Sequence, residues 1–491
     1  MTSQSVLSKS ARGSAYNIAV SAITIVLGFV RSVLLMRLLT PDPFGFVALA
    51  LFFVTFLTPF STFGIDSALI QRQRPGQETF STHLVVRLTL AIMILVLGLL
   101  ASPVLRRIYA EQVVVVDVFL VLLGINVLRA SFSTPGAILR RDMRFGAIAW
   151  LNLLSSLAMT ITAPLLAYLG AGLWSLVVEQ AVGPAVRWVG LWVFLRPWRL
   201  SLRFDWDEAK SLLRFGRHVL SANVLGILLD RFDDFWTGTV LGPTQLGYYS
   251  RAYEVAQYPE RVLATPITSV FYPAYATLQE DREELSRAFF RSSSFLVRVG
   301  LLVATVLVVT APEVTVVLFG ETWLPIVPVF RLMLVYIMLD PLYVNLSYLI
   351  IGAGRPDLLS RVRLIQVLVF ILAVIAAAHV WGINGVAIAA DLMMVSGTLA
   401  LTIYSRRFVR FSLWRMFWWP AVATAASAGL GLLLLLHGVL RTYLWGALMF
   451  KALSLSGVYI LILYLAERRT IREYGSRILQ PIWHQLRTRI S

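Results

Sequence analysis

The sequence predicts an all-α polytopic membrane protein of about 14 transmembrane helices. Three observations predict this class: 58% of the 491 residues are apolar, only 14% are charged, and basic residues gather on alternate connections between apolar segments. Soluble domains carry about 25% charged residues, so this chain could not cover the surfaces of several soluble domains. The net charge of +17 fits basic cytoplasmic loops, and no nucleic-acid partner is expected.

Fourteen segments are apolar and long enough to cross a bilayer, which takes about 20 residues. In chain order they are 14–38, 44–66, 79–101, 113–133, 147–169, 172–195, 214–240, 245–272, 293–311, 323–351, 359–380, 383–405, 416–437 and 443–466. Two of them, 245–272 and 323–351, contain charges within their length. The connections between the segments are too short for a soluble catalytic domain, so the chain is not expected to be an enzyme.

The distribution of Lys and Arg predicts the orientation of the chain. One side of the membrane receives basic residues on every connection, from Lys9 and Arg12 to a basic tail that begins at Arg468. The other side has only Arg106, Arg107 and Arg441 clear of the helix ends, an asymmetry that the sequence keeps through all fourteen segments. Because basic residues collect on the cytoplasmic side, we predict an inner-membrane protein with both termini in the cytoplasm.

An internal repeat predicts how the helices are grouped. At an offset of 202 residues, LTPDPFGF (39–46) lies over LGPTQLGY (241–248), and a fainter echo sets Gly172-Leu173-Trp174 against 385–387. Both copies begin on the cytoplasmic side, so the repeats are parallel, with a pseudo-two-fold axis along the membrane normal. This predicts an N-lobe of six helices with an interfacial link (1–212), a C-lobe of six (213–412), and two extra helices with a basic tail (413–491).

Polar side chains follow one face of several spans. Ionisable groups at membrane depth are costly and usually face a cavity or a partner, although small polar residues also simply pack helices together and charges also pair off. One planar guanidinium group can bind two phosphate oxygens at once. Several arginines in one cavity therefore favour an anionic ligand. The candidates for that cavity are Asn17, Arg31, Arg87, Arg251, Tyr258, Arg261 and Arg331.

The carboxylates inside the spans form a second set of candidates, for gating or for coupling to H⁺ or Na⁺. They are Asp230, Asp233, Asp234, Glu254 and Asp340. At the repeat offset Arg31 corresponds to Asp233, which suggests a salt bridge between the two halves. Asp66 and Arg129 lie near cytoplasmic ends, where their side chains can reach water. The sequence shows no metal-ligand spacing, no nucleotide phosphate loop and no Cys, so no cofactor is expected.

Six short motifs resemble the polysaccharide transporter family of the multidrug/oligosaccharidyl-lipid/polysaccharide exporter superfamily. The similarity is to its Wzx-type oligosaccharide flippases, the branch that includes the colanic acid exporter. The motifs are GFVR (28–31), RLLTP (37–41), FGIDSALIQ (63–71), RRDMRF (140–145), LGYYSRAY (246–253) and GAGRP (352–356). They are spread over the first 360 residues, and the rest of the chain resembles the family in hydropathy.

The resemblance implies two helical bundles around a central cationic cavity that works by alternating access. It implies that the cargo is an undecaprenyl-diphosphate-linked oligosaccharide, moved from the cytoplasmic to the outer leaflet for exopolysaccharide or lipopolysaccharide assembly. A polymerase and a chain-length regulator of the same pathway would be partners. Three alternatives stay open: a lipid II flippase, another antiporter of the superfamily, and a membrane glycosyltransferase or polymerase.

Overall fold

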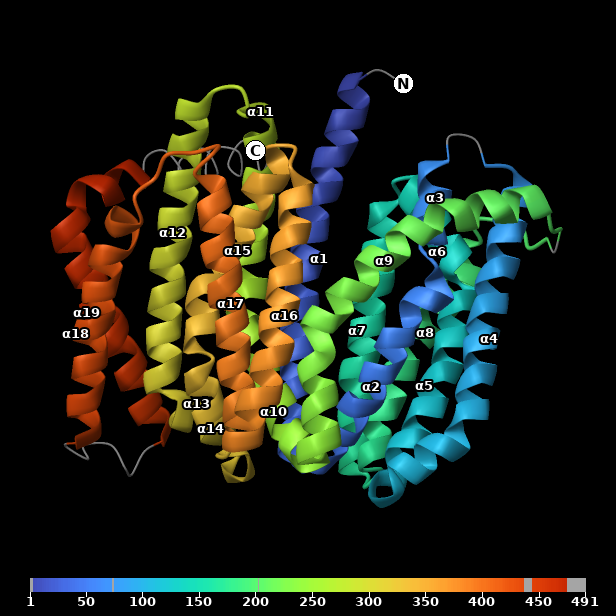
Figure 1. Cartoon of the computed structure of the whole chain (residues 1–491), viewed down its shortest axis with the longest axis horizontal. Helices are drawn as coiled ribbons and strands as arrows, with labels where there is room; N and C mark the ends of the chain where they lie inside the picture. Colours follow the sequence, from blue (N-terminus) through green and yellow to red (C-terminus); the bar gives the residue numbers. More distant parts are fainter. Residues whose placement is uncertain (1–2, 73–74, 202, 437–443, 475–491) are drawn as a thin grey trace. The chain divides into compact units, whose positions relative to one another are not determined.

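The computed structural model describes residues 3–72, 75–201, 203–436 and 444–474, with side chains except at 3–19, 217–219, 221–225, 263–270, 334, 435–436 and 469–474. These described residues form 19 α-helices and no strand (Figure 1). The helices are α1 (Ser3–Leu38), α2 (Pro41–Thr62), α3 (Ile65–Gln71), α4 (Gln77–Ile108), α5 (Val113–Ser131), α6 (Ser133–Arg141), α7 (Phe145–Tyr168), α8 (Leu173–Val189), α9 (Trp206–Trp236), α10 (Pro243–Pro259), α11 (Thr265–Thr277), α12 (Arg282–Val309), α13 (Ala311–Leu318), α14 (Ile326–Leu332), α15 (Leu334–Gly352), α16 (Pro356–Trp381), α17 (Ile383–Ser405), α18 (Leu413–Leu436) and α19 (Leu444–Tyr474). The predicted all-α class is confirmed.

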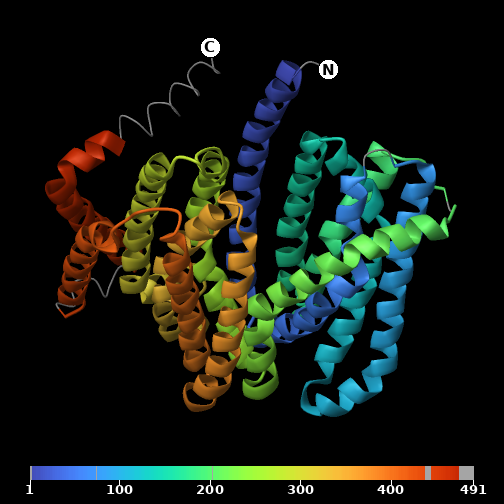
Figure 2. The same cartoon turned by 45° about the horizontal axis from the view of Figure 1, so that its top comes forward.

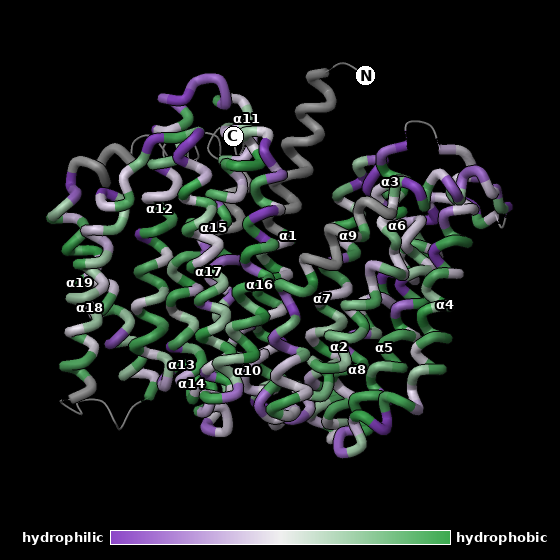
Figure 3. The backbone as a smooth tube through the Cα atoms, viewed as in Figure 1, coloured by the Kyte–Doolittle hydropathy of each residue, from purple (hydrophilic) through white to green (hydrophobic). Residues whose placement is uncertain are grey.

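Among the described residues, 11 helical segments are long and apolar enough to cross a membrane. They overlap eleven of the fourteen predicted spans, and α17 has the bounds that the sequence predicts for it. The span predicted at 323–351 is corrected, because Met333 divides it into α14 and α15. Apolar residues fill the middle of these helices, while hydrophilic residues gather at their ends and in the connections (Figure 3). The chain is therefore a multi-pass membrane protein, and the count of fourteen stays a prediction.

The other three predicted spans, 172–195, 214–240 and 245–272, each contain part or all of a π-helical turn. The turns occupy Gly190–Leu195, Thr237–Leu241 and Glu260–Ala264. A π turn adds a residue to the helical repeat and often marks a functional position. The third turn follows Pro259, the last residue of α10, whose missing N–H interrupts the helical hydrogen bonding. The segment predicted at 245–272 is helical throughout, as α10, the π turn and α11.

Internal contacts divide the chain into two compact units. The first contains Met1–Glu254, Leu318–Ile326 and Arg363–Ala389, and the second contains Val255–Val317, Val327–Val362 and Ala390–Ser491. In the first unit α7 packs against α1 and α8, and α4 runs beside α5 (Figures 1 and 2). In the second unit α12 packs against α15, α18 and α19. The lobes predicted at 1–212, 213–412 and 413–491 stay a prediction.

The described part of the second unit contains two buried ion pairs. Arg298 on α12 donates two hydrogen bonds to the Glu467 carboxylate on α19, at 2.8 and 2.6 Å, and Lys451 pairs with Glu313. Around the first pair lies an apolar core to which α11, α12, α15, α18 and α19 all contribute. Such pairing removes the cost of a lone charge in an apolar interior.

The two copies of the predicted repeat touch each other reciprocally inside the first unit. Both α2 and α10 begin with a proline, and a Cβ placed on Gly45 would lie 1.7 Å from the Pro243 carbonyl oxygen. In the reverse direction, a Cβ on Gly247 would lie 2.1 Å from the Pro41 carbonyl oxygen. Only glycine therefore allows these two helix starts to pack backbone against backbone, which explains why the repeat keeps Pro and Gly four residues apart.

Candidate functional site

Four charged side chains from α1, α8 and α10 form a cluster in the first unit. The Arg31 Nε lies 2.9 Å from the Glu179 Oε1, and Arg251 pairs with Glu254 one turn along α10. Arg251 and Glu254 are both close enough to act electrostatically on the Glu179 carboxylate. The four side chains are between 13% and 24% exposed. Two positive and two negative charges therefore balance inside a mostly buried group, which we call the four-charge cluster.

Each arginine of the four-charge cluster keeps one unused hydrogen-bond donor. The Arg31 Nη1 and the Arg251 Nε are buried and have no hydrogen-bond partner in the described part of the chain. The Arg251 guanidinium lies over the Phe44 ring, 4.9 Å from its centroid. A buried donor without an acceptor costs about 1–3 kcal/mol. An anionic oxygen that entered the cluster would recover this free energy.

The predicted salt bridge between Arg31 and Asp233 is wrong. Glu179 projects from α8 to Arg31 and takes the place of Asp233 as its partner. Asp233 instead accepts a hydrogen bond from the Tyr249 hydroxyl at 2.7 Å, and its neighbour Asp234 pairs with Arg231 at 2.9 Å. The two aspartates are buried and held within α9 and α10.

A cavity of about 440 Å³ lies among α3 to α8 of the first unit. Its polar lining combines four arginines with one aspartate and two amides: Asp66, Arg87, Arg129, Arg140, Asn152, Gln180 and Arg187. We call it the arginine cavity. Its small residues, such as Gly136 and Gly183, leave room between the helices. The lining has an excess of positive charge that suits an anionic ligand.

Asp66 neutralises one part of the arginine cavity. The His83 Nε2 and the Arg87 Nε lie 3.2 and 3.3 Å from its Oδ1, and the Arg140 Nη2 lies 4.0 Å from its Oδ2. Burial alone would raise the pKa of the Asp66 carboxyl, but His83, Arg87 and Arg140 outweigh this and hold the pKa below its usual value. The Asp66 carboxylate therefore stays charged and forms ion pairs with Arg87 and Arg140.

Arg129 and Arg187 form the uncompensated part of the arginine cavity. The Arg129 Nη2 donates to the Gln180 Oε1 at 3.4 Å, and neither arginine has a carboxylate within ion-pair distance among the described residues. Both guanidinium groups line the same cavity, where their like charges repel each other. Two like charges facing one cavity without a counter-ion are the arrangement that a diphosphate would neutralise.

The sequence marks Arg129 and Arg187 as charged residues inside predicted spans, but they were not among the candidates for the cavity. Arg129 lies close to a predicted cytoplasmic end, where reaching water is the simpler explanation. The available signal was in the sixth span, where Gly183 and Pro184 leave space beside Arg187.

The remaining predicted site residues lie elsewhere. In the second unit, the Arg261 Nη2 donates to the Gln257 Oε1 at 2.6 Å and the guanidinium lies over the Tyr258 ring. The Arg331 Nε donates to the Val308 carbonyl at 3.3 Å. Asp340 is buried on α15, within electrostatic range of Glu260.

Two candidates of the first unit also stand apart from the cavity. Asp230 is exposed on α9, and the Asn17 side chain lies outside the described residues. The structure therefore groups Arg31, Arg251 and Glu254 in the four-charge cluster and places Arg87 in the arginine cavity.

Comparison with known sequences relates the chain to polysaccharide biosynthesis. A family model described as polysaccharide biosynthesis protein matches residues 34–328. The lipopolysaccharide biosynthesis protein WzxC of Escherichia coli (strain K12) is 24% identical over 445 residues, which are 88% of this chain and 89% of WzxC. The succinoglycan biosynthesis transport protein ExoT of Rhizobium meliloti (strain 1021) is 28% identical over 313 residues, or 63% of this chain and 62% of ExoT.

Comparison with solved structures shows the fold. The lipid II flippase MurJ in its inward closed conformation has a TM-score of 0.77 at 12% identity, covering 93% of this chain and 99% of MurJ. An inward-facing multidrug resistance MATE transporter of the MOP superfamily has a TM-score of 0.61 at 17% identity, covering 80% of this chain and 98% of the transporter. These similarities confirm the predicted all-α membrane fold.

Proposed function

Because the chain belongs to the family of polysaccharide biosynthesis proteins, we propose that it is a flippase for an undecaprenyl-diphosphate-linked oligosaccharide repeat unit. It moves this cargo from the cytoplasmic to the outer leaflet, where exopolysaccharide or lipopolysaccharide is assembled. Relatives named for lipopolysaccharide and succinoglycan biosynthesis support a cargo of this kind. The transport changes no covalent bond, so the protein acts without catalytic residues.

The observation that carries the proposal is the arginine cavity. Arg129 and Arg187 face it without a carboxylate partner among the described residues, and they replace the water that a diphosphate loses when it leaves the headgroup region. Burying the diphosphate and the sugar hydroxyls inside protein avoids the cost of moving them through hydrocarbon. The polyprenyl tail can stay in the surrounding lipid throughout the cycle.

The four-charge cluster is the proposed second contact for the cargo. In the absence of cargo, Glu179 and Glu254 hold Arg31 and Arg251 in a neutral group. An arriving phosphate takes up the unused donors of the two arginines and competes with the two glutamates. This exchange gives two states of the cluster, cargo-bound and ion-paired, as alternating access requires.

The membrane placement belongs to the same proposal. We place the protein in the bacterial inner membrane with both termini in the cytoplasm, because its basic residues lie on that side of the predicted spans. A polymerase and a chain-length regulator would take over the cargo on the outer side.

A reconstituted flipping assay tests the proposed cargo. Purified protein in proteoliposomes is given fluorescent polyprenyl-diphosphate oligosaccharide, fluorescent lipid II or a fluorescent phosphatidylcholine, and a membrane-impermeant quencher reports the outer-leaflet fraction. We expect fast flipping of the oligosaccharide lipid and background rates for the other two. Faster flipping of lipid II than of the oligosaccharide lipid would replace the proposed cargo with the peptidoglycan precursor.

The same vesicles test energy coupling. If Asp233, Asp234 or Glu254 couples transport to H⁺ or Na⁺, an imposed gradient should drive net flipping, and the matching Asp→Asn or Glu→Gln variant should remove this dependence. The same test applies to Asp230→Asn and Asp340→Asn, the other two candidates for coupling. Flipping by the unmodified protein that ignores both gradients would mean facilitated exchange drawn by polymerisation.

A further inference from the structure

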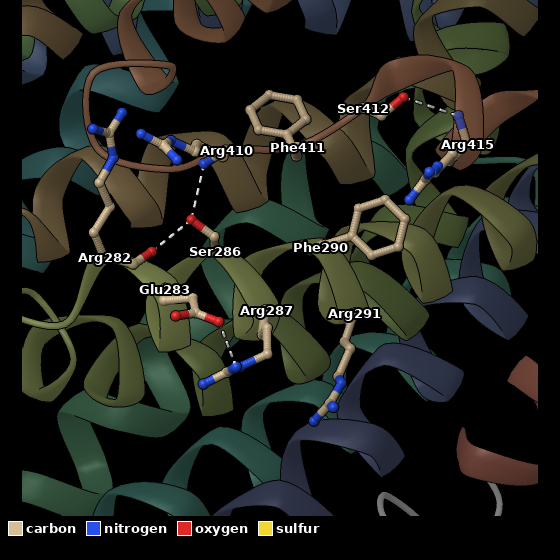
Figure 4. Close-up of a pocket in the computed structure, with 10 residues that line it drawn as sticks. All are labelled: Arg282, Glu283, Ser286, Arg287, Phe290, Arg291, Arg410, Phe411, Ser412 and Arg415. Carbon is tan, nitrogen blue, oxygen red and sulfur yellow. Dashed lines mark hydrogen bonds and ion pairs between the residues drawn. The ribbon is translucent and has the colours of Figure 1, made fainter.

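A second basic pocket lies in the second unit, outside the residues used above. It measures about 770 Å³ and lies between the start of α12 and the connection that leads into α18 (Figure 4). Five arginines and one glutamate line it: Arg282, Arg287, Arg291, Arg410, Arg415 and Glu283. On α12, Glu283, Arg287 and Arg291 recur every four residues and so share one helix face.

Hydrogen bonds hold the two walls of this pocket together. The Ser286 hydroxyl donates to the Arg282 carbonyl at 2.6 Å and accepts from the Arg410 N–H at 2.8 Å (Figure 4). The Arg282 Nη2 donates to the Arg406 carbonyl at 3.0 Å. The connection before α18 is therefore fixed against α12, and the pocket is a built feature of the unit.

Four of the five arginines have no counter-ion in the described part of the chain, and one of these four, Arg282, is held by the Arg406 carbonyl. Glu283 accepts from Arg287 at 2.9 Å, four residues further along the helix. Arg291, Arg410 and Arg415 have no carboxylate within ion-pair distance among the described residues. Three uncompensated guanidinium groups around one cavity attract an anion with several oxygen atoms.

Aromatic residues place this pocket at the level of lipid headgroups. Trp414, Trp418 and Trp419 are exposed in the first turns of α18, and the Trp414 and Trp418 rings stack with centroids 4.3 Å apart. Tryptophan gathers at the membrane–water interface, and a membrane-spanning segment begins at Leu413. Phe290 and Phe411 add apolar surface inside the pocket.

We propose that this pocket binds the phosphate and glycerol of an anionic phospholipid from the surrounding leaflet. The three uncompensated arginines contact the phosphate, while the tryptophans of α18 pack against the acyl chains. A soluble phosphate would gain nothing from this apolar surface. Basic pockets at the cytoplasmic ends of transmembrane helices suit the negative lipids of that leaflet, and the predicted orientation places this pocket there.

The test compares two matched double variants of the full-length protein. Arg410→Gln with Arg415→Gln removes two charges from the pocket wall. Arg406→Gln with Arg407→Gln removes two charges from the same connection, but neither residue lines the pocket. Native mass spectrometry in detergent measures the binding of phosphatidylglycerol and phosphatidylcholine, and competition with pyrophosphate and undecaprenyl diphosphate identifies the source of the bound phosphate.

We expect phosphatidylglycerol to bind about 30-fold more weakly to the Arg410/Arg415 variant and equally well to the Arg406/Arg407 variant. If the first variant does not fold, Arg291→Gln on the opposite wall gives the answer, with phosphatidylglycerol binding weakened. If phosphatidylglycerol binding were weakened equally in both double variants, the proposal would be overturned, because the lipid would then respond to the overall charge of the connection and not to this pocket. Competition by pyrophosphate as strong as that by phosphatidylglycerol would assign the pocket to soluble anions, and preference for undecaprenyl diphosphate would assign it to the cargo.

Discussion

Arg31 shows what an arginine inside the membrane requires of its surroundings. Its position in the middle of the first span marks it in the sequence as a cavity residue, because a charge there needs a partner or water. The identity of the partner could not be predicted, since Glu179 reaches it only through the packing of α1, α7 and α8. The repeat offset pointed to Asp233 as the partner, but the Asp233 carboxylate accepts a hydrogen bond from Tyr249 instead.

The Arg31–Glu179 pair predicts a specific pattern of stability changes. Arg31→Ala leaves Glu179 buried without its partner and should lower the free energy of unfolding by about 3 kcal/mol. The double variant with Glu179→Ala should lose less than Arg31→Ala alone, because no lone charge remains. Thermal unfolding in detergent measures the three proteins. A double variant that is the least stable of them would contradict the pairing.

Asp66 predicts a dependence of stability on pH. Its native pKa lies below its usual value because His83, Arg87 and Arg140 surround it. Its contribution is complete above the unfolded pKa of about 3.9 and is lost as the pH falls through the lower native pKa. The melting temperature of the unmodified protein should therefore fall more steeply below about pH 4 than that of Asp66→Asn.

Asp142→Asn is the control for this pH dependence, since Asp142 is exposed near the same end of the unit. This variant should follow the unmodified protein throughout the titration. An Asp66→Asn profile that also follows the unmodified protein would mean that Asp66 contributes nothing to the pH dependence of stability.

Among the helices, sequence reasoning succeeded wherever a span is uninterrupted and apolar. The apolar run 383–405 coincides with α17, whereas 323–351 is divided at Met333 into α14 and α15. Hydropathy averages over such a break, because the residues on both sides remain compatible with a membrane. The repeat was visible because Pro41, Gly45, Pro243 and Gly247 meet in one reciprocal contact.

The reciprocal contact predicts that Gly45→Ala and Gly247→Ala are both strongly destabilising. Each added Cβ would lie about 2 Å or less from a backbone carbonyl oxygen of the facing helix, which backbone cannot avoid without separating the helices. We expect a loss of about 3 kcal/mol for each. Gly124→Ala, where a Cβ meets no atom within 4 Å, should be neutral or slightly stabilising. Equal melting temperatures for the three variants would show that the starts of α2 and α10 do not pack backbone against backbone.

At the scale of the whole molecule, the orientation in the membrane rests on charge alone. The chain contains no Cys, so a single introduced cysteine can be labelled without background. Cysteines at Gln77 and Ser412 should react with a membrane-impermeant reagent only from the cytoplasmic side, and a cysteine at Ala171 only from outside. Labelling at Ala171 from the cytoplasm would reverse the predicted topology.

In the proposed function Arg129 and Arg187 hold the diphosphate of the cargo, and a comparison of three proteins tests this role. Binding and flipping of polyprenyl-diphosphate oligosaccharide are compared between the unmodified protein, Arg129→Gln with Arg187→Gln, and a control with Arg144→Gln and Arg199→Gln. The control removes two exposed arginines of the same unit that do not line the cavity.

We expect about 100-fold weaker binding and no flipping for the Arg129/Arg187 variant, with the control unchanged. Binding and flipping at unmodified levels in the Arg129/Arg187 variant would contradict it.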